Sequence, residues 1–275
     1  MPVRVERSDR ILTIIQSRPE ARNAVDPDHA QALYEAFVAF DADAAADVAV
    51  FWGEGGAFCA GADLKSLAAR GIATPENAAT HTSLEFPKDG GATPRGPMGP
   101  TRLRLSKPVI AAIEGPAVAG GLELALWADC RVMAEGSFIG VYNRRWGVPL
   151  SDGGTVRLPR LVGEGRALEL IMTGRKVDAE ECLRIGLCER LVPRGEARRA
   201  AEAMAHEIAR FPQASLRADR RSVYLQYGLA ERAALEREWS NCSGVFKAEG
   251  AAGAARFAEG AGRHGDFGNF AQPQT

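Results

Sequence analysis

The sequence predicts an α/β fold whose central sheet is mainly parallel. Short apolar runs typical of buried strands alternate with helical patterns through the first half of the chain, and the last third is mostly helical. The composition, with 46% hydrophobic and 25% charged residues in 275, is that of a globular protein with a sizeable core. Strands that alternate with helices are typical of parallel sheets covered by their connecting helices.

The first elements are two strands and a helix. Residues 3–5 and 11–15 carry the apolar pattern of short strands, joined by a turn of polar residues. Asp26 can cap a helix and Pro27 suits its first turn, and apolar residues then recur at helical spacing as far as Phe40. The chain therefore begins with a strand pair followed by an amphipathic helix.

The middle of the chain continues the alternation around one irregular stretch. Residues 48–52 are a buried-type strand, and a helix is expected to begin near Ala62. Glycine and proline crowd the end of residues 71–100, which predicts a mobile surface loop or lid and no domain boundary. A buried strand over residues 108–113 resumes the pattern directly afterwards.

The second half changes from alternation to helices. Residues 115–121 are expected to form a turn, residues 122–127 a helix and residues 130–134 a strand. A last strand is expected over residues 187–192, and the Ala- and Gly-rich tail after residue 250 is left partly unassigned. Helices are expected over residues 163–172, 178–184, 196–210, 213–226 and 231–246.

Charge and composition exclude several classes of partner. With 34 basic and 35 acidic side chains the net charge is −1, so no nucleic acid is expected to bind. No run of 18 apolar residues occurs and the N-terminus lacks an apolar signal core, so neither a membrane span nor export is expected, and the cytoplasm is the expected location. The five cysteines and four histidines show no metal-ligand spacing, so no metal is expected and the thiols are expected to be buried or half-buried.

Two glycine-rich turns are the candidate site. Residues 58–64 and 118–124 each follow a buried strand and open a helix. Backbone N–H groups at a helix start are unpaired, and glycine lets a ligand come close. Two such turns facing each other would form an oxyanion hole, whereas either turn alone could be an ordinary tight turn. A dinucleotide-binding fingerprint is excluded, because Phe58 and Leu168 stand where its third glycine is required.

Taken together, five segments resemble the crotonase superfamily, which is the enoyl-CoA hydratase/isomerase family. They occur in the family's order within residues 10–195. Together they are highly specific for the family. The segments are residues 18–24, 56–64, 107–113, 119–125 and 153–163.

The resemblance implies a fold, an assembly and a substrate. The fold is the ClpP-like crotonase spiral of repeated ββα units, with the core and acyl-CoA site in residues 1–195. Residues 196–275 would form a helical region that makes trimer contacts and part of the acyl pocket. The substrate would be an acyl-CoA thioester, and no cofactor is expected because coenzyme A is part of that substrate.

The resemblance also assigns binding residues. The N–H groups of Ala62 and Gly120 match the family's oxyanion-hole donors, which polarise the thioester carbonyl. The residues that match the family's coenzyme A contacts are Arg22, Ala24, Ala60, Asp63 and Leu64. Without the resemblance, Arg22 would be taken as a solvated surface charge.

Three side chains are the candidate catalytic residues. Glu123 matches one of the two catalytic glutamates of hydratases, and its alternative role is a helix N-terminal acid stabilised by the dipole. Counting back from residues 153–155, the second glutamate is replaced by Asn143, whose amide cannot transfer a proton at neutral pH. Asp152 resembles an aspartate of the dienoyl-CoA isomerase branch and could substitute for it, or could be only a turn or cap residue.

Hydration of a 2-enoyl-CoA is the function that the resemblance favours. A double-bond isomerase that uses one glutamate, and an acyl-CoA binding protein without catalysis, stay open as alternatives. A homotrimer or a dimer of trimers is expected, because relatives assemble this way and the final helices carry more apolar residues than one layer needs. These residues are Leu216, Tyr224, Leu225, Tyr227, Leu229, Leu235 and Trp239.

Overall fold

The computed structural model describes residues 2–69, 84–89 and 91–262. Most of the first part of the expected lid, and the end of the tail, lie outside these residues. Within the described part of the chain, no helix is long and apolar enough to cross a membrane. No group of three potential metal-ligating side chains occurs there either.

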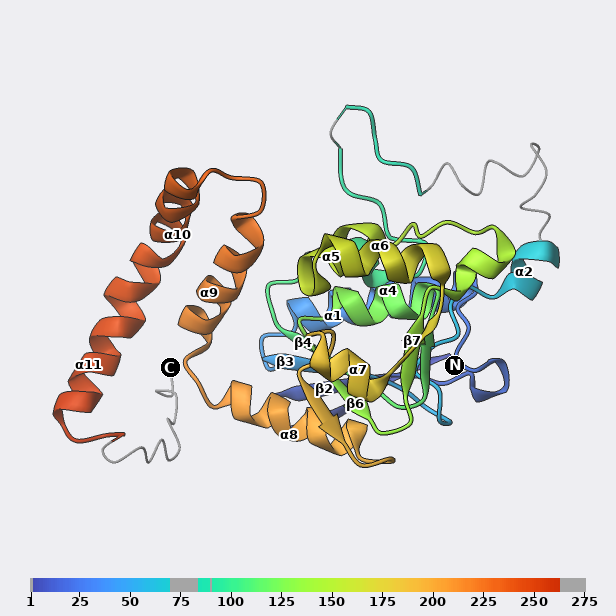
Figure 1. The fold of residues 1–275 in the computed structure, drawn as a ribbon. Helices are drawn as coiled ribbons and strands as arrows, with labels where there is room; N and C mark the ends of the chain where they lie inside the picture. The colour runs from blue at the N-terminus through green and yellow to red at the C-terminus, as the bar shows by residue number, and fades with distance from the viewer. Residues whose placement is uncertain (1, 70–83, 90, 263–275) are drawn as a thin grey trace.

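A six-stranded sheet forms the centre of the molecule (Figure 1). The first strand runs antiparallel to the second, and every other neighbouring pair is parallel, which confirms the predicted mainly parallel sheet. In spatial order the strands are β1 (Val3–Ser8), β2 (Ile11–Gln16), β3 (Val48–Gly53), β4 (Val109–Ile113), β6 (Cys130–Ala134) and β9 (Arg190–Val192).

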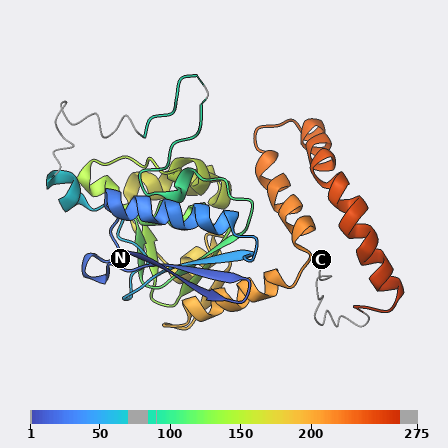
Figure 2. The same cartoon turned by 180° about the vertical axis from the view of Figure 1, so that it is seen from behind.

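Helices cover both faces of this sheet (Figures 1 and 2). Because side chains alternate along a strand, Leu12 and Ile14 join the core formed with α1 (Pro27–Ala42), whereas Ile11 lies on the opposite face. There it packs with the alanines of α8 (Ala197–Ala209). Both helices lie where the sequence places them, and Asp26 caps α1 by accepting the His29 N–H at 2.8 Å.

A second, smaller sheet lies beside the first. It consists of β5 (Pro116–Val118), β7 (Phe138–Gly140) and β8 (Lys176–Asp178). The prediction of a simple turn over residues 115–121 was therefore wrong, since three of these residues form a strand too short to show a periodic pattern. The other helices of this part of the chain are α2 (Leu64–Ala69), α4 (Gly120–Trp127), α5 (Gly154–Val162), α6 (Glu164–Thr173) and α7 (Ala179–Arg184), of which α4 contacts β5 and α7 contacts β7 and β8.

The end of the expected lid is not a surface loop. Residues 96–102 pack into the molecule, and a 3-10 helix, η3 (Pro100–Arg102), follows a tight turn between Gly96 and Gly99. Met98 and Thr101 are buried. The glycines and prolines permit this close packing, so their density indicated tight turns here and not mobility.

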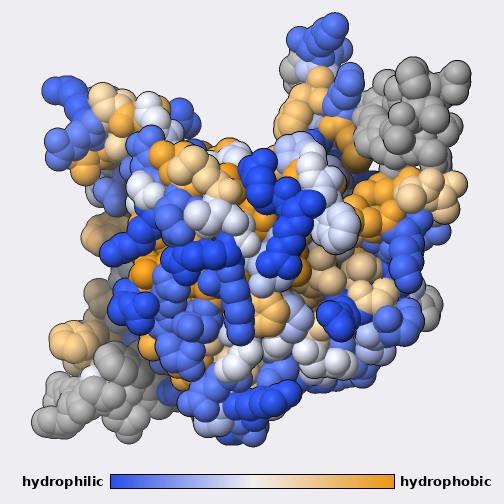
Figure 3. Space-filling model, turned by 45° about the vertical axis from the view of Figure 1, so that its right-hand side comes forward, coloured by the Kyte–Doolittle hydropathy of each residue, from blue (hydrophilic) through white to orange (hydrophobic). Residues whose placement is uncertain are grey.

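The C-terminal helices stand beside the sheet and its covering helices (Figures 1 and 2). They are α9 (Gln213–Leu225), α10 (Glu231–Val245), a π-helical turn η5 (Phe246–Gly250) and α11 (Ala251–Ala258). Leu235 and Trp239 are exposed there, as the prediction of an apolar surface requires. Figure 3 shows another face, where hydrophobic patches and hydrophilic side chains lie next to one another.

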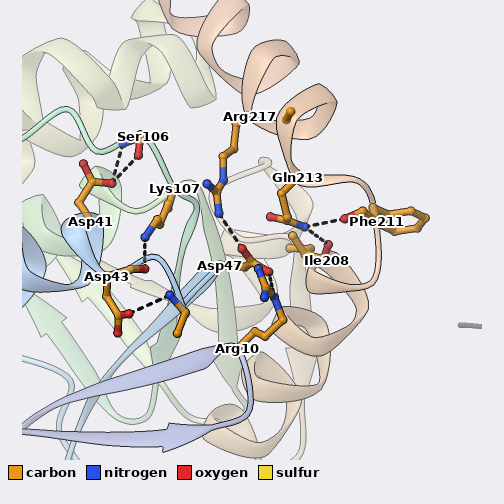
Figure 4. A network of polar contacts seen from close by, with 12 residues as sticks. Arg10, Asp41, Asp43, Asp47, Ser106, Lys107, Ile208, Phe211, Gln213 and Arg217 are labelled. Atoms are coloured by element: carbon orange, nitrogen blue, oxygen red, sulfur yellow. Dashed lines mark hydrogen bonds and ion pairs between the residues drawn. The ribbon is translucent and has the colours of Figure 1, made fainter. Parts of the chain in front are cut away.

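An ion pair with the buried Asp47 connects α9 to the segment before β3 (Figure 4). Asp47, just before β3, accepts hydrogen bonds from Arg10 and, at 2.7 Å, from Arg217 of α9. Nearby, the buried Lys107 donates to the carbonyl oxygens of Phe40 at 3.0 Å and Asp43 at 2.6 Å. Lys107 thus closes the C-terminal end of α1, where backbone carbonyls lack helical partners.

Lys107→Met is expected to lower the free energy of unfolding by about 1–3 kcal/mol, because the substitution leaves buried carbonyl oxygens without donors. Burial lowers the pKa of Lys107 in the folded protein, so folding disfavours its ammonium form, and the stability lost in the variant is expected to be larger at high pH, where the native protein no longer has to bury this charge. Denaturant unfolding checks this. The exposed Lys88→Met is the control, and an equal loss in both variants would contradict the role given to Lys107.

Candidate active site

The two glycine-rich turns lie directly against each other. The Cys59 N–H donates to Pro116 O and the Val118 N–H donates to Cys59 O, both at 3.0 Å. A β-carbon on Gly121 would lie 2.2 Å from Cys59 O, and one on Gly61 would lie 3.1 Å from the Gly120 nitrogen. Glycine is required at both places because the two backbones are in contact.

This contact leaves two backbone donors free. The Asp63 N–H is used by Val25 O at 2.9 Å, but the N–H groups of Ala62 and Gly120 donate to no residue that the structure describes. Ala119, at φ 53°, holds the left-handed backbone that turns the chain into α4. The free N–H groups belong to adjoining turns, as an oxyanion hole requires.

Glu123 lies in the first turn of α4 and is 3% exposed. Its Oε1 accepts the N–H groups of Asp152 and Gly154, both at 2.8 Å. Burial and the nearby Asp152 carboxylate raise the pKa of Glu123 to about 7, although these N–H groups oppose the rise. A carboxyl with a pKa near neutrality can both accept and donate a proton under physiological conditions.

Asp152 is buried next to Glu123 and is also 3% exposed. Its Oδ1 accepts the Met98 N–H at 3.0 Å and the Thr101 hydroxyl. The cap of α5 is Gly153, with no side-chain cap bond, so the cap role considered for Asp152 was wrong. Burial raises the pKa of Asp152, whereas its hydrogen bonds and nearby arginines oppose this change.

Glu123 and Asp152 form a pair of carboxyl groups. In Glu123 both short backbone bonds end on Oε1, and in Asp152 both bonds end on Oδ1. Among the hydrogen bonds found within the described part of the chain, none of this length reaches the second oxygen of either group, although the Ser151 N–H also lies close to the Glu123 carboxyl and opposes the rise of its pKa. Each carboxyl is therefore oriented by one oxygen and keeps the other for a water molecule or a substrate.

Asn143 lies in η4 (Tyr142–Trp146) and is 6% exposed. Its Nδ2 donates to Val148 O at 2.8 Å, while its buried Oδ1 has no partner among the described residues. The Asn143 side chain thus connects the two ends of the segment 143–148. Its match to the missing glutamate stays an inference from the resemblance.

The residues matched to coenzyme A contacts come from two neighbouring segments. Arg22 is exposed, and its carbonyl accepts the Ala60 N–H at 3.0 Å. Leu64 is partly exposed at the start of α2. Ala24 O and the Asp63 carboxylate both bind the Arg18 guanidinium, at 2.7 and 3.1 Å.

Sequence reasoning missed the segment that carries Met98 and Thr101. Besides binding Asp152, this segment places Met98 over Gly120, since a β-carbon on Gly120 would lie 2.6 Å from Met98 Sδ. Arg157 completes the arrangement by donating to Asp152 O and Thr101 O at 2.8 and 2.6 Å. The signal was present only as closely spaced glycines and prolines.

The family model for enoyl-CoA hydratase/isomerase matches residues 6–264 of this chain. The chain belongs to the enoyl-CoA hydratase/isomerase family. An enoyl-CoA hydratase of Mycobacterium tuberculosis is 32% identical over 226 residues, which are 80% of this chain and 79% of the relative. A carnitinyl-CoA dehydratase of Salmonella typhi is 38% identical over 204 residues, 74% and 72% of the two chains.

Solved structures agree with this family assignment. The crystal structure of an enoyl-CoA hydratase from Mycobacterium tuberculosis is 35% identical with a TM-score of 0.82, and covers 94% of this chain and 96% of its own. An enoyl-CoA hydratase from Bacillus anthracis is 30% identical with a TM-score of 0.81 over the same shares. The predicted crotonase fold is thereby confirmed.

Proposed function

We propose that the protein hydrates a 2-enoyl-CoA. The observation that carries this proposal is the pair formed by Glu123 and Asp152, each with one oxygen fixed and one available, beside the free N–H groups of Ala62 and Gly120. Two carboxyl groups can move the two protons of a hydration, and the two N–H groups can stabilise the enolate between them.

The carboxyl groups take opposite parts in the reaction. One carboxylate accepts a proton from water as the water oxygen bonds to C3, and the electrons of the double bond move onto the thioester oxygen. The N–H groups of Ala62 and Gly120 hold this oxyanion. The other carboxyl, in its protonated form, then gives a proton to C2 as the carbonyl is restored. Dehydration follows the same steps in reverse.

The surroundings of the two carboxyl groups support giving the base role to Asp152 and the acid role to Glu123. Burial raises the pKa of Asp152, but Arg102, Arg157 and two accepted hydrogen bonds oppose this rise, which supports the role of base. Glu123 has its pKa raised to about 7 and suits the acid. Two carboxyl groups in different surroundings are a common basis for separate acid and base roles.

Two substrates with the double bond in different places test the proposal. We expect turnover of 2-butenoyl-CoA to 3-hydroxybutanoyl-CoA, measured by loss of the conjugated thioester absorbance. 3-Butenoyl-CoA in a parallel assay tests for isomerase activity. Tight binding of both with turnover of neither would make the protein an acyl-CoA binding protein.

The isomerase is the second candidate, because one observation favours it. Asn143 carries no carboxyl group and its amide is held by Val148 O, so it adds no proton carrier to the site. A double-bond shift needs only one group to carry a proton between two carbons, and Glu123 could do so alone. Conversion of 3-butenoyl-CoA without hydration would favour this alternative.

The hydration rate is expected to fall as the pH rises through about 7, because Glu123 must be protonated to act as the acid. The measurement is kcat/KM for 2-butenoyl-CoA between pH 5 and pH 9, corrected for the folded fraction at each pH. A rate that rises through this range would instead make Glu123 the base and exchange the two roles.

Self-association belongs to the same proposal. We expect the exposed apolar residues of α10, among them Leu235 and Trp239, to lie in contacts between copies of this chain in a trimer or a dimer of trimers. Leu235 and Trp239 are four positions apart and therefore share one face of this helix.

A further inference from the structure

Three arginines gather around the buried carboxylate of Asp152. Arg102 and Arg157 act on this carboxylate electrostatically, and Asp152 acts on Arg95 in the same way. None of the three forms an ion pair with an acidic side chain within residues 2–69, 84–89 and 91–262. They therefore form a charged cluster that ordinary salt bridges do not explain.

Two of these arginines are bound to backbone carbonyl groups. Arg157 donates to the carbonyl oxygens of Asp152 and Thr101. Arg102 donates to Leu84 O and lies 4.4 Å from the ring centre of Phe86. Both guanidinium groups thus have fixed structural contacts.

Arg95 has far fewer contacts. Its guanidinium donates to Gly96 O at 3.1 Å, which is its own neighbour in the chain. The side chain is half-buried, and burial lowers the pKa of Arg95. An arginine has five N–H donors, so most of those on Arg95 are left for a ligand or solvent.

Arg95 lies at the edge of the acyl site. A β-carbon on the adjoining Gly96 would lie 2.8 Å from Asp152 Oδ1, so this backbone touches the carboxyl pair directly. Two residues further along, Met98 packs over the oxyanion donor Gly120. Arg95 therefore belongs to the segment that contacts Asp152 and packs over Gly120.

The charges around this position do not balance. Arg95, Arg102 and Arg157 lie within electrostatic reach of the Asp152 carboxyl, Arg157 also of the Glu123 carboxyl, and Glu123 has its pKa raised to about 7. The net charge is +1 with both carboxyls ionised, from +3 and −2, and +2 with Glu123 protonated. A half-buried site with excess positive charge favours an anionic ligand.

We propose that Arg95 binds a carboxylate carried by the acyl group, so that the substrate is a 2-enoyl-CoA whose acyl chain ends in a carboxylate. This inference rests on the proposed hydratase function and narrows its substrate class. A guanidinium matches a carboxylate with two parallel hydrogen bonds, which gives both affinity and orientation. The phosphates of coenzyme A are the other anions present, and the experiment separates them from the acyl group.

The experiment compares three substrates. These are 4-carboxybut-2-enoyl-CoA, its methyl ester, and 2-butenoyl-CoA. The acid and the ester share the reacting double bond and differ in charge. We expect kcat/KM of the native protein to be at least about tenfold higher for the acid than for the ester, since a fixed charge pair is lost in the ester.

The test variant is Arg95→Gln, which keeps an N–H donor for Gly96 O. Its kcat/KM values for the acid and the ester are expected to agree within about threefold. Its kcat/KM for 2-butenoyl-CoA is expected to stay within the same margin of the native value. Arg95→Lys keeps the charge without the two-pronged geometry and is expected to retain part of the preference. Arg104→Gln, at an exposed neighbouring arginine, is the control and is expected to keep all of it.

Three results would overturn the proposal. They are equal rates for acid and ester in the native protein, an unchanged preference in Arg95→Gln, and a KM raised equally for all three substrates. The last would place a coenzyme A phosphate on Arg95. Hydration of 2-butenoyl-CoA without an acid preference would refute this inference alone, whereas failure to hydrate any of the three would refute the proposed function. The comparison of the acid with the ester in the native protein tests the proposal even if a variant does not fold.

Discussion

Glu123→Gln is expected to lower the hydration rate of 2-butenoyl-CoA by at least about a hundredfold, because the amide cannot give a proton to C2. The variant is expected to fold, since the amide oxygen can still accept the N–H groups of Asp152 and Gly154. The measurement is kcat on protein whose folded fraction is checked by circular dichroism. Glu135→Gln, at an exposed glutamate, is the matched control.

The same variant is expected to be more stable than the native protein at high pH. Because the folded-state pKa of Glu123 is raised from 4.5 to about 7, its contribution to stability is full below pH 4.5 and is lost as the pH rises through 7. The shift corresponds to about 3 kcal/mol when the carboxyl is ionised. Glutamine has no such loss, so the free energies of unfolding of the native protein and the variant are expected to agree near pH 4 and to differ by pH 8.

An inactive Glu123→Gln that shows no stability gain at pH 8 would contradict the raised pKa. A variant that keeps native turnover would contradict the proton-transfer role itself. In that case Glu123 would be a helix N-terminal acid held by the backbone of α5, and the chemistry would depend on Asp152 alone.

Asp152→Asn is expected to lower hydration of 2-butenoyl-CoA about a hundredfold or more, because the amide cannot accept a proton from water. The asparagine oxygen can still accept from Met98 N–H and Thr101, so the neighbouring segment is expected to stay in place. The measurement is kcat beside the melting temperature. Thr101→Val, which removes one donor and leaves the carboxylate, is the control and is expected to lose less activity.

Asn143→Glu in the same assay distinguishes two explanations for the second proton-transferring group. Either Asp152 supplies it, or it is missing because position 143 carries an asparagine. If Asp152 is the base, a glutamate at position 143 is expected to add little. It would also remove the donor to Val148 O and bury a charge, so lower stability is expected. A gain of tenfold or more would show that the site lacked an acid at position 143, which would contradict the role given to Asp152.

The sequence predicted the elements that repeat a pattern and missed those defined by contacts across the fold. α1 and the long strands β2 and β3 have clear periodicity and were found. β5 has three residues and is specified by its pairing with β7, which no local pattern shows. Short elements of this kind depend on tertiary pairing.

The candidate site was predicted in part for the same reason. Glu123 could be placed because it stands at a fixed distance from two glycines that open its helix. The bond between Asp152 and Met98 joins residues 54 positions apart, and Thr101 is reached in the same way. Such a bond has no counterpart in the local sequence, so the segment around Met98 was taken for a surface loop.

The proposed thioester position is bounded by the main-chain N–H groups of Ala62 and Gly120, and this affects how the protein can diverge. A substitution at Ala62 changes a side chain but does not delete the N–H donor beside it, whereas one at Glu123 or Asp152 changes the proposed acid or base outright. The ability to polarise a thioester is thus robust to mutation, while the choice of reaction is not. A lineage built on this scaffold can exchange one reaction for another by replacing single side chains and still retain its class of substrate.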